Sequence, residues 1–146
     1  MDIEVRLIET DVDLKKAFAI REQVFIREQN IDRSDEYDEF EETSYHFLAL
    51  VEGVPAGTCR WRKTAEGAKL ERFATLSNFR KIGVGSQLLQ KAISHISAQV
   101  SDDRMKMYLN AQVTAMPLYA KLGFTAEGQR FLECEIEHQK MSREIG

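Results

Sequence analysis

The sequence predicts an α+β fold, in which one mixed, mostly antiparallel twisted sheet of about six to seven strands carries helices on both faces. Strand-like segments at residues 46–52, 56–63 and 69–75, joined by short turns, indicate antiparallel pairing. An amphipathic segment at 83–100 separates the third of these strands from a further one, which indicates a strand–helix–strand unit with parallel pairing. The length predicts a single domain spanning 1–146, because about 100–200 residues suffice to bury a core.

The elements before this sheet segment follow from residue spacing. Residues 3–8 alternate apolar and charged side chains, as a half-buried strand does. Apolar residues then recur at helical spacing over residues 14–25, and either Asp11 or Asp13 is placed to cap this helix. We expect the helix to end near residues 27–30.

The last part of the chain is predicted to contain a strand, a short helix and one or two further strands. Residues 106–112 form the strand. Thr114 is predicted to cap a helix that ends at Leu122. Gly123 then stands where a left-handed residue often follows a helix.

Composition narrows the classes of function. A formal net charge of −4 argues against nucleic-acid binding. The first residues contain neither a basic stretch nor an apolar run, and no segment approaches the roughly 18 apolar residues of a membrane span. The two cysteines, Cys59 and Cys134, fit neither a disulfide framework nor a metal site. We therefore expect a cytoplasmic protein with reduced thiols, no metal and no membrane contact.

The strongest local signal lies between residues 71 and 86. A strand runs into a loop that contains Arg80, Lys81, Gly83 and Gly85, and the loop opens an amphipathic helix. A helix N-terminus has unpaired N–H groups and partial positive charge, glycines allow close approach, and the basic residues add full charges, so the segment suits a pyrophosphate. The glycines alone would equally suit a tight turn into a packed helix. The phosphate-loop and dinucleotide motifs are both absent.

Two motifs of the chain resemble those of the GCN5-related N-acetyltransferase (GNAT) superfamily. Arg80-Lys81-Ile82-Gly83-Val84-Gly85 matches the cofactor motif Arg/Gln-x-x-Gly-x-Gly/Ala, and residues 117–124 resemble the hydrophobic-Tyr-x-x-x-Gly-Phe segment. Further segments, among them 24–29 and 110–112, resemble a subfamily of small, uncharacterised bacterial acyltransferases. The resemblance implies a GNAT fold, splayed between the fourth and fifth strands. It also implies direct acetyl transfer from acetyl-CoA to an amine through a tetrahedral intermediate.

The same resemblance implies where acetyl-CoA binds. Backbone N–H groups of the motif loop are expected to hold the pyrophosphate, and the fourth strand to bind the pantetheine arm and the thioester. The implied cofactor-binding residues are Phe73, Ala74, Thr75, Arg80, Lys81, Ile82, Gly83, Val84, Gly85, Ser86 and Asn110.

Two proton transfers need side chains. Tyr119 matches the general acid that the family uses to protonate the departing thiolate, and the alternative for it is a packing residue. Glu71, on the predicted fourth strand, is the expected general base, with a salt bridge to Arg72 or Arg60 as its alternative. The residues predicted to bind the acceptor are Glu28, Arg60, Arg72 and His138. Of these, Glu28 and His138 are also rival candidates for the general base.

The acceptor is predicted to be the primary amine of a small molecule. The acidic segment, residues 32–42, is expected to be a solvated loop or short helix, in a position where it could also attract a cationic amine. By contrast, Arg21, Arg60 and Arg72 in one cleft would favour a carboxylate or phosphate. The alternatives are a protein N-acetyltransferase, or an acyl-CoA-binding sensor or complex subunit without turnover. We expect a monomer or a homodimer.

Overall fold

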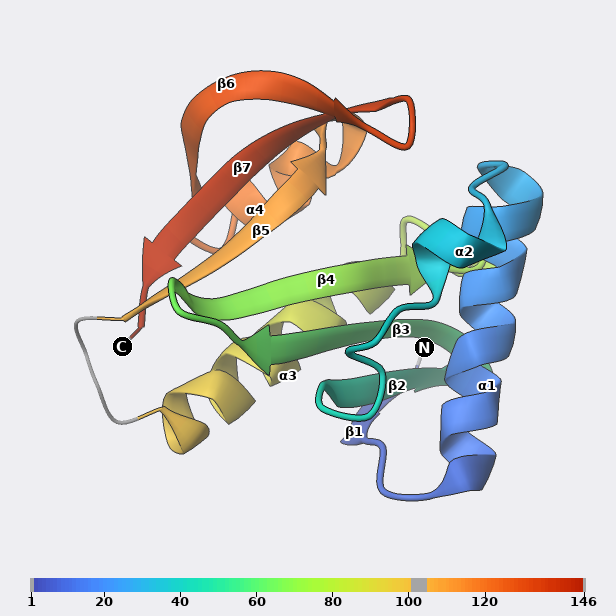
Figure 1. Cartoon of the computed structure of the whole chain (residues 1–146). Helices are drawn as coiled ribbons and strands as arrows, with labels where there is room; N and C mark the ends of the chain where they lie inside the picture. The colour runs from blue at the N-terminus through green and yellow to red at the C-terminus, as the bar shows by residue number, and fades with distance from the viewer. Residues whose placement is uncertain (1, 101–104, 146) are drawn as a thin grey trace.

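The computed structural model describes residues 2–100 and 105–145, and within them seven strands form one sheet with helices on both faces (Figure 1). The strands are β1 (Ile3–Leu7), β2 (Tyr45–Val51), β3 (Val54–Lys63), β4 (Gly67–Thr75), β5 (Lys106–Gln112), β6 (Thr125–Glu133) and β7 (Ile136–Glu144). Their order is β1-β2-β3-β4-β5-β7-β6, and only β4 and β5 are parallel. The predicted mixed, mostly antiparallel sheet is confirmed, while the predicted domain limits at residues 1 and 146 lie outside the described ranges.

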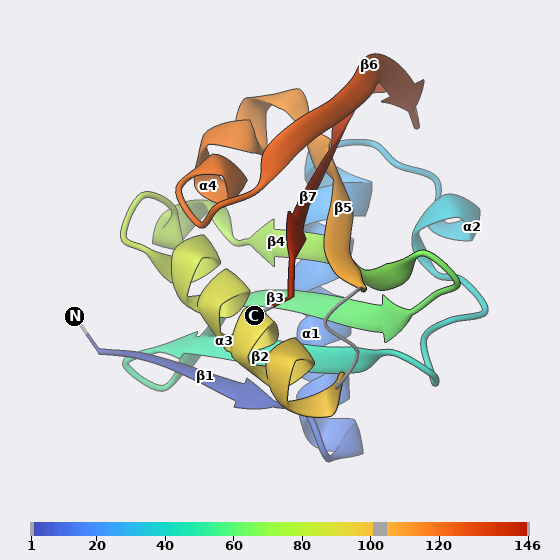
Figure 2. The ribbon, with the colours of Figure 1, turned by 90° about the vertical axis from the view of Figure 1, so that its left-hand side faces the viewer.

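Two helices cover opposite faces of the sheet, as Figure 2 shows. α1 (Asp11–Arg21) continues as a π-helix, η1 (Glu22–Glu28), and both pack against one face. α3 (Val84–Gln99) packs against the other face, where the larger of the two hydrophobic clusters of the core lies. The shorter helices are α2 (Arg33–Glu36), η2 (Ser77–Phe79), η3 (Val113–Ala115) and α4 (Met116–Ala120). In the described part of the chain, no helix is both long enough and apolar enough to cross a membrane.

β4 and β5 pair only at their beginnings and then diverge. Residues 67–69 of β4 face residues 106–108 of β5, and the parallel pairing stops there. Beyond this point β5 stays paired with β7 and β4 stays paired with β3, so their facing edges carry backbone N–H and C=O groups that no strand satisfies. Figure 1 shows the two strands opening into a V. The predicted splay between the fourth and fifth strands is therefore confirmed.

The predicted helix caps are wrong. Thr10, rather than Asp11 or Asp13, caps α1, because its hydroxyl accepts a hydrogen bond from the Asp13 N–H at 3.2 Å. The Asp13 carboxylate instead accepts a 2.9 Å hydrogen bond from Nε of Arg6 on β1. Thr114 lies inside η3, and α4 begins without a side-chain cap. The Asp13 carboxylate, which residue spacing alone assigned to the cap of α1, therefore pairs with Arg6 of the neighbouring strand.

Two hairpins close with pairs of residues in the left-handed conformation. Glu52 and Gly53 (φ 49° and 79°) join β2 to β3, and Cys134 and Glu135 (φ 51° and 63°) join β6 to β7. Two-residue turns of this kind match the twist of the strands but need positive φ at both positions. A glycine marks the first turn in the sequence. The second contains neither glycine nor asparagine, so residue type did not reveal it.

Candidate active site

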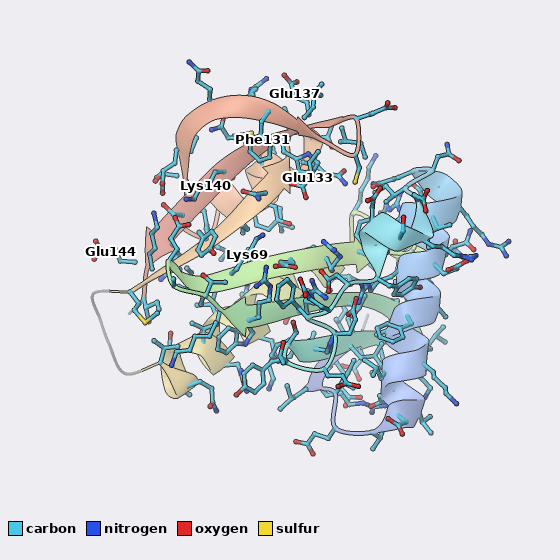
Figure 3. The ribbon with its side chains drawn as sticks, in the orientation of Figure 1. Lys69, Phe131, Glu133, Glu137, Lys140 and Glu144 are labelled. Atoms are coloured by element: carbon cyan, nitrogen blue, oxygen red, sulfur yellow. The ribbon has the colours of Figure 1, made fainter. Side chains whose placement is uncertain are left out.

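A pocket of about 170 Å³ opens between the diverging parts of β4 and β5. Its wall comes from these two strands, from the end of η1, from α2 and α4, and from the β6–β7 hairpin. Figure 3 shows Lys69 of β4 in this space and Glu133 near the end of the β6–β7 hairpin. The pocket thus collects side chains from segments spread over most of the chain.

Six of the predicted site residues line this pocket: Glu71, Arg72, Phe73, Asn110, Tyr119 and His138. Glu28 and Arg60, which were predicted to bind the acceptor, do not line it. The other predicted cofactor residues, 74–75 and 80–86, continue from the end of β4 to the start of α3. The candidate site therefore has two parts, the pocket and the N-terminus of α3.

The N-terminus of α3 presents backbone N–H groups without partners. Its first helical hydrogen bond runs from the N–H of Gln87 to the C=O of Gly83 at 3.0 Å, so the N–H groups of residues 84–86 have no acceptor among the described residues. Lys81 and Gly83 are left-handed (φ 68° and 101°), and turns of this kind point successive N–H groups toward one side. A Cβ added at Gly83 would meet nothing within 4 Å, so the site is open. This arrangement suits the predicted pyrophosphate.

Arg80 stands beside this loop but binds protein groups. Its guanidinium donates two hydrogen bonds of 2.7 Å to the carboxylate of Glu28, and its Nε donates to the C=O of Thr75 at 2.9 Å. Glu28 is the last residue of η1, so the structure places it next to the loop before α3 rather than in the pocket. The ion pair is exposed, and exposed pairs are worth roughly 0–1 kcal/mol. Arg80 can therefore exchange Glu28 for a phosphate at little cost.

Tyr119 is 5% exposed, and its ring packs edge-to-face against Phe73 with the centroids 5.5 Å apart. Burial, with a smaller contribution from Cys59, raises the pKa of Tyr119 above its usual value. The structure gives its hydroxyl no hydrogen-bond partner among the described residues, although every fully buried side-chain N or O there has one. The hydroxyl is therefore open to the pocket that Tyr119 lines, and it carries its proton at neutral pH.

Glu71 is held by ion pairs. Its carboxylate accepts hydrogen bonds from Nε of Arg60 at 3.2 Å and Nε of Arg62 at 2.8 Å, and Nζ of Lys69 lies 3.6 Å away. Burial alone would raise the pKa of Glu71, but the charge and hydrogen bonds of Arg60, with Lys69 and Arg62, lower it below its usual value. The structure contains the salt bridge to Arg60 that the sequence offered as the alternative to a base role for Glu71. The base role of Glu71 stays a prediction, and these contacts weaken it.

The acidic segment packs against the protein through buried arginines. Arg21, 1% exposed, donates hydrogen bonds to Glu36 at 2.7 Å and to Glu41 at 2.8 Å. Arg60 is fully buried and also pairs with Glu41, at 2.9 Å. A buried guanidinium needs paired carboxylates, because an uncompensated buried charge is costly. The expected short helix is present as α2, but the segment is solvated only in part, because Glu36 is buried and Glu41 is half-buried in these ion pairs. Neither Arg21 nor Arg60 lines the pocket.

Arg72 is the arginine that lines the pocket, and its backbone is unusual. It has a φ of 59° and lies where the register of β3 and β4 shifts. Its Nε donates to the C=O of Glu36 and an Nη donates to the carboxylate of Asp38, both at 3.2 Å. A bulge re-aims the side chains of a strand, and left-handed residues other than glycine cluster at functional sites. Here the bulge places Arg72 so that its side chain binds the acidic segment at the rim of the pocket.

β5 and β7 bring Asn110 and His138 to the pocket wall. His138 is 8% exposed and stacks on Phe131 with the ring centroids 5.8 Å apart. Its Nδ1 lies 2.6 Å from the C=O of Ile136. Asn110 is half-buried and pairs with Lys140 of β7. Both residues therefore take their positions from the part of the sheet beyond the splay.

The sequence missed several wall residues. Gln29 and Gln112, 83 residues apart, exchange amide hydrogen bonds of 2.9 and 3.3 Å across the pocket wall. Asp35, Glu133 and Cys134 are exposed and also line the pocket. The two glutamines lie in segments that resemble the small bacterial subfamily, which was the signal available for them. No spacing in the sequence relates Asp35 to Glu133 and Cys134.

The family model described as an acetyltransferase (GNAT) domain matches residues 13–145. The chain belongs to the GNAT family. YyaT, an uncharacterized protein of Bacillus subtilis (strain 168), is 36% identical over 98% of this chain and 97% of its own. YjcF, an uncharacterized N-acetyltransferase of the same strain, is 34% identical over 94% of this chain and 97% of its own. The crystal structure of a Bacillus subtilis acetyltransferase in complex with CoA shares the fold, with a TM-score of 0.73 at 18% identity over 98% of this chain and 99% of that one.

GNAT acetyltransferases use acetyl-CoA, and the two parts of the site suit such a molecule. The unpaired N–H groups at the start of α3 suit its pyrophosphate, and the free edge of β4 suits the amides of its pantetheine arm. Within residues 2–100 and 105–145, no group of three or more His, Cys, Asp or Glu side chains is placed to hold a metal ion.

Proposed function

We propose that this GNAT protein transfers an acetyl group from acetyl-CoA to the primary amine of a small molecule. The observation that carries the proposal is that the start of α3 lies beside α4, the helix that contributes Tyr119 to the pocket. A Cβ added at Gly85 would lie 3.2 Å from the side chain of Leu118, and the next residue, Tyr119, lines the pocket. A CoA thioester whose pyrophosphate is bound at α3 would extend along β4 toward Tyr119.

Each part of the site has a task in this reaction. The N–H groups of residues 84–86 would compensate the charge of the pyrophosphate. Free N–H groups on β4 beyond residue 69 would bind the pantetheine arm and stabilise the oxyanion of the tetrahedral intermediate, which is worth about 3 kcal/mol per donor. Tyr119 would give its proton to the departing thiolate, since its raised pKa keeps it protonated. The acyl group passes directly to the amine.

The dimensions of the pocket support a small acceptor. A volume of about 170 Å³ between two strands admits a short amine but not a folded surface. α2 and the β6–β7 hairpin contribute to its wall. An extended peptide carrying a lysine or a free N-terminus is the alternative acceptor, and the assay below separates the two.

Calorimetry with CoA and a thiol-release assay with acetyl-CoA test the proposal. The assay uses a panel of small amines and a panel of peptides. Thiol release with small amines supports the proposal, and release with peptides alone makes the protein a protein N-acetyltransferase. CoA binding without release from any acceptor makes it an acyl-CoA-binding module.

Gly83→Asp tests the cofactor site, with Gly83→Asn as the matched control. Both variants add a Cβ at a left-handed position with φ of 101°, but only Asp adds a negative charge beside the phosphates. We expect Asp to raise the Kd for CoA at least about tenfold more than Asn, since close like charges cost more than 1 kcal/mol. Equal Kd values for the two variants would contradict the placement of the pyrophosphate.

A further inference from the structure

We propose that Nε2 of His138 is the base that takes the proton of the acceptor amine. The inference rests on the proposed acyl transfer and assigns a step of it that Glu71 is poorly suited to perform. It is carried by the hydrogen bonding and burial of the His138 ring, and by the place of the ring in the pocket that Tyr119 also lines.

The backbone selects the tautomer of His138. Nδ1 lies 2.6 Å from the C=O of Ile136, and a carbonyl oxygen can only accept, so Nδ1 carries the hydrogen and donates it. In the neutral ring, Nε2 then holds a free lone pair. Stacking on Phe131, with an angle of 22° between the rings, fixes the ring plane. The imidazole is therefore held with one nitrogen anchored and the other ready to accept.

His138 lines the pocket and is only 8% exposed, and its Nε2 has no hydrogen-bond partner among the described residues. Every fully buried side-chain N or O of the described residues has such a partner, so Nε2 is not fully enclosed. His138 pairs with Gln112 on β5 and with Phe131 on β6, and Gln112 lines the same pocket. The ring therefore lines the pocket with an Nε2 that is not fully enclosed and has no partner among the described residues.

The other ionisable side chains that face this pocket are less suited to accept a proton. They are Asp35 and Glu36 of α2, Lys69, Glu71 and Arg72 of β4, Tyr119 of α4, and Glu133 and Cys134 of the β6–β7 hairpin. Glu36 and Glu71 are paired with arginines, and Asp35 and Glu133 are exposed to water. Partial desolvation of the otherwise exposed Cys134, together with the neighbouring carboxylates, raises the pKa of its thiol, which keeps it protonated.

Two side chains, His138 and Tyr119, account for every proton transfer of the reaction. Nε2 of His138 takes one proton from the ammonium group, and the nitrogen lone pair forms the C–N bond at the thioester carbon. The C–S bond breaks, and the sulfur leaves with the proton of the Tyr119 hydroxyl. The second proton of the nitrogen then passes to the Tyr119 oxygen, and the imidazolium releases its proton to water.

Two variants separate base chemistry from packing. In His138→Asn the amide replaces the Nδ1–H donor to Ile136 and removes Nε2, whereas His138→Gln keeps a polar group near Nε2 that cannot take a proton. The control is Glu137→Gln, because Glu137 is exposed and points away from the space between β4 and β5 (Figure 3). CoA affinity by calorimetry reports whether each variant is folded.

With the amine that gives the fastest thiol release, we expect both His138 variants to lose about 10²-fold or more in kcat, and Glu137→Gln to lose nothing. In the wild type, kcat/KM should reach a plateau below the pKa of the free amine. In the variants, it should keep rising about tenfold per pH unit, because only amine deprotonated in solution reacts. Wild-type kinetics in either variant would overturn the assignment while leaving acyl transfer intact.

Nitrogen NMR of the wild-type protein supplies a test that needs no variant. We expect the neutral His138 ring to be protonated at Nδ1 and bare at Nε2, with the signal of Nε2 shifting when the amine is added to the CoA complex. A ring protonated at Nε2 would overturn the inference even if the variants are inactive. An absence of thiol release from the wild type with every acceptor would instead remove the proposed function, and this inference with it.

Discussion

Asp38→Asn tests whether the acidic segment is held by charge. The Asp38 carboxylate accepts hydrogen bonds from Arg60 at 2.7 and 3.0 Å and from Arg72 at 3.2 Å. Burial alone would raise the pKa of Asp38, but the hydrogen bonds and charge of Arg60 lower it from 3.8 to about 2. A carboxylate whose pKa falls on folding stabilises the protein above its unfolded pKa and loses this contribution as the pH falls toward the folded value.

The size of the effect follows from the shift. At about 1.4 kcal/mol per pKa unit, the charged Asp38 contributes about 2 kcal/mol to the free energy of unfolding at pH 7 and about 1 kcal/mol at pH 3. Neutral Asn resembles the protonated carboxyl, and it can still accept the hydrogen bond that Asp38 accepts from the N–H of Phe40. The stability difference between wild type and Asp38→Asn should therefore shrink by about half between these pH values.

Urea unfolding at pH 7, 5 and 3 measures this difference directly. Glu39→Gln is the matched control, because Glu39 lies in the same segment, is exposed, and forms no ion pair among the described residues. We expect the control to change stability by less than about 0.5 kcal/mol at every pH. A difference between wild type and Asp38→Asn that stays constant from pH 7 to pH 3 would refute the argument.

Three further substitutions probe other parts of the molecule. Tyr119→Phe should lower kcat about 10²-fold without changing the Kd for CoA, and equal turnover would remove Tyr119 as the acid. Glu28→Gln should tighten CoA binding about 2- to 5-fold at low salt, because it releases Arg80 from an exposed ion pair, and such pairs are worth roughly 0.2–1 kcal/mol. Calorimetry that finds no tightening would exclude competition between Glu28 and CoA for Arg80. Gly57→Ala should lower stability by about 1–3 kcal/mol in urea unfolding, since the added Cβ would lie 2.8 Å from Val84; unchanged stability would show that the core yields there.

The fold was largely predictable from local patterns. Alternation and helical spacing located the strands and the long helices because the same side chains that make the pattern are the ones buried. Errors occurred where a side chain had a distant competitor. Asp13 did not cap α1 because Arg6 of β1 binds it. Glu71 likewise has partners in Arg60 and Arg62 of the neighbouring strand, of which the sequence offered only Arg60 as an alternative to the base role. Such partners come from strand pairing, which residue spacing does not reveal.

The two parts of the candidate site differed in how far the sequence revealed them. The N-terminus of α3 was predictable because its geometry is local: consecutive residues supply the glycines, the basic side chains and the N–H groups. The pocket could be predicted only in part, because its wall is assembled from eight helices and strands. His138 entered the prediction as one of several rivals. Its Nδ1 is anchored locally by the C=O of Ile136, and the pairing of β7 with β5 and β6 places the ring at the pocket.

The sequence by itself therefore determined the class of fold and the segment suited to a pyrophosphate, since both depend on neighbours in the chain. The tertiary structure alone decided which charges are paired and which polar atoms remain free in the pocket. The buried ion pairs of Arg21 and Arg60 with the acidic segment, and the amide pair of Gln29 and Gln112, join residues far apart in sequence. A side chain's proton affinity depends on the groups that folding brings within a few ångströms of it, so the chemistry of the pocket could be assigned only once the chain was folded.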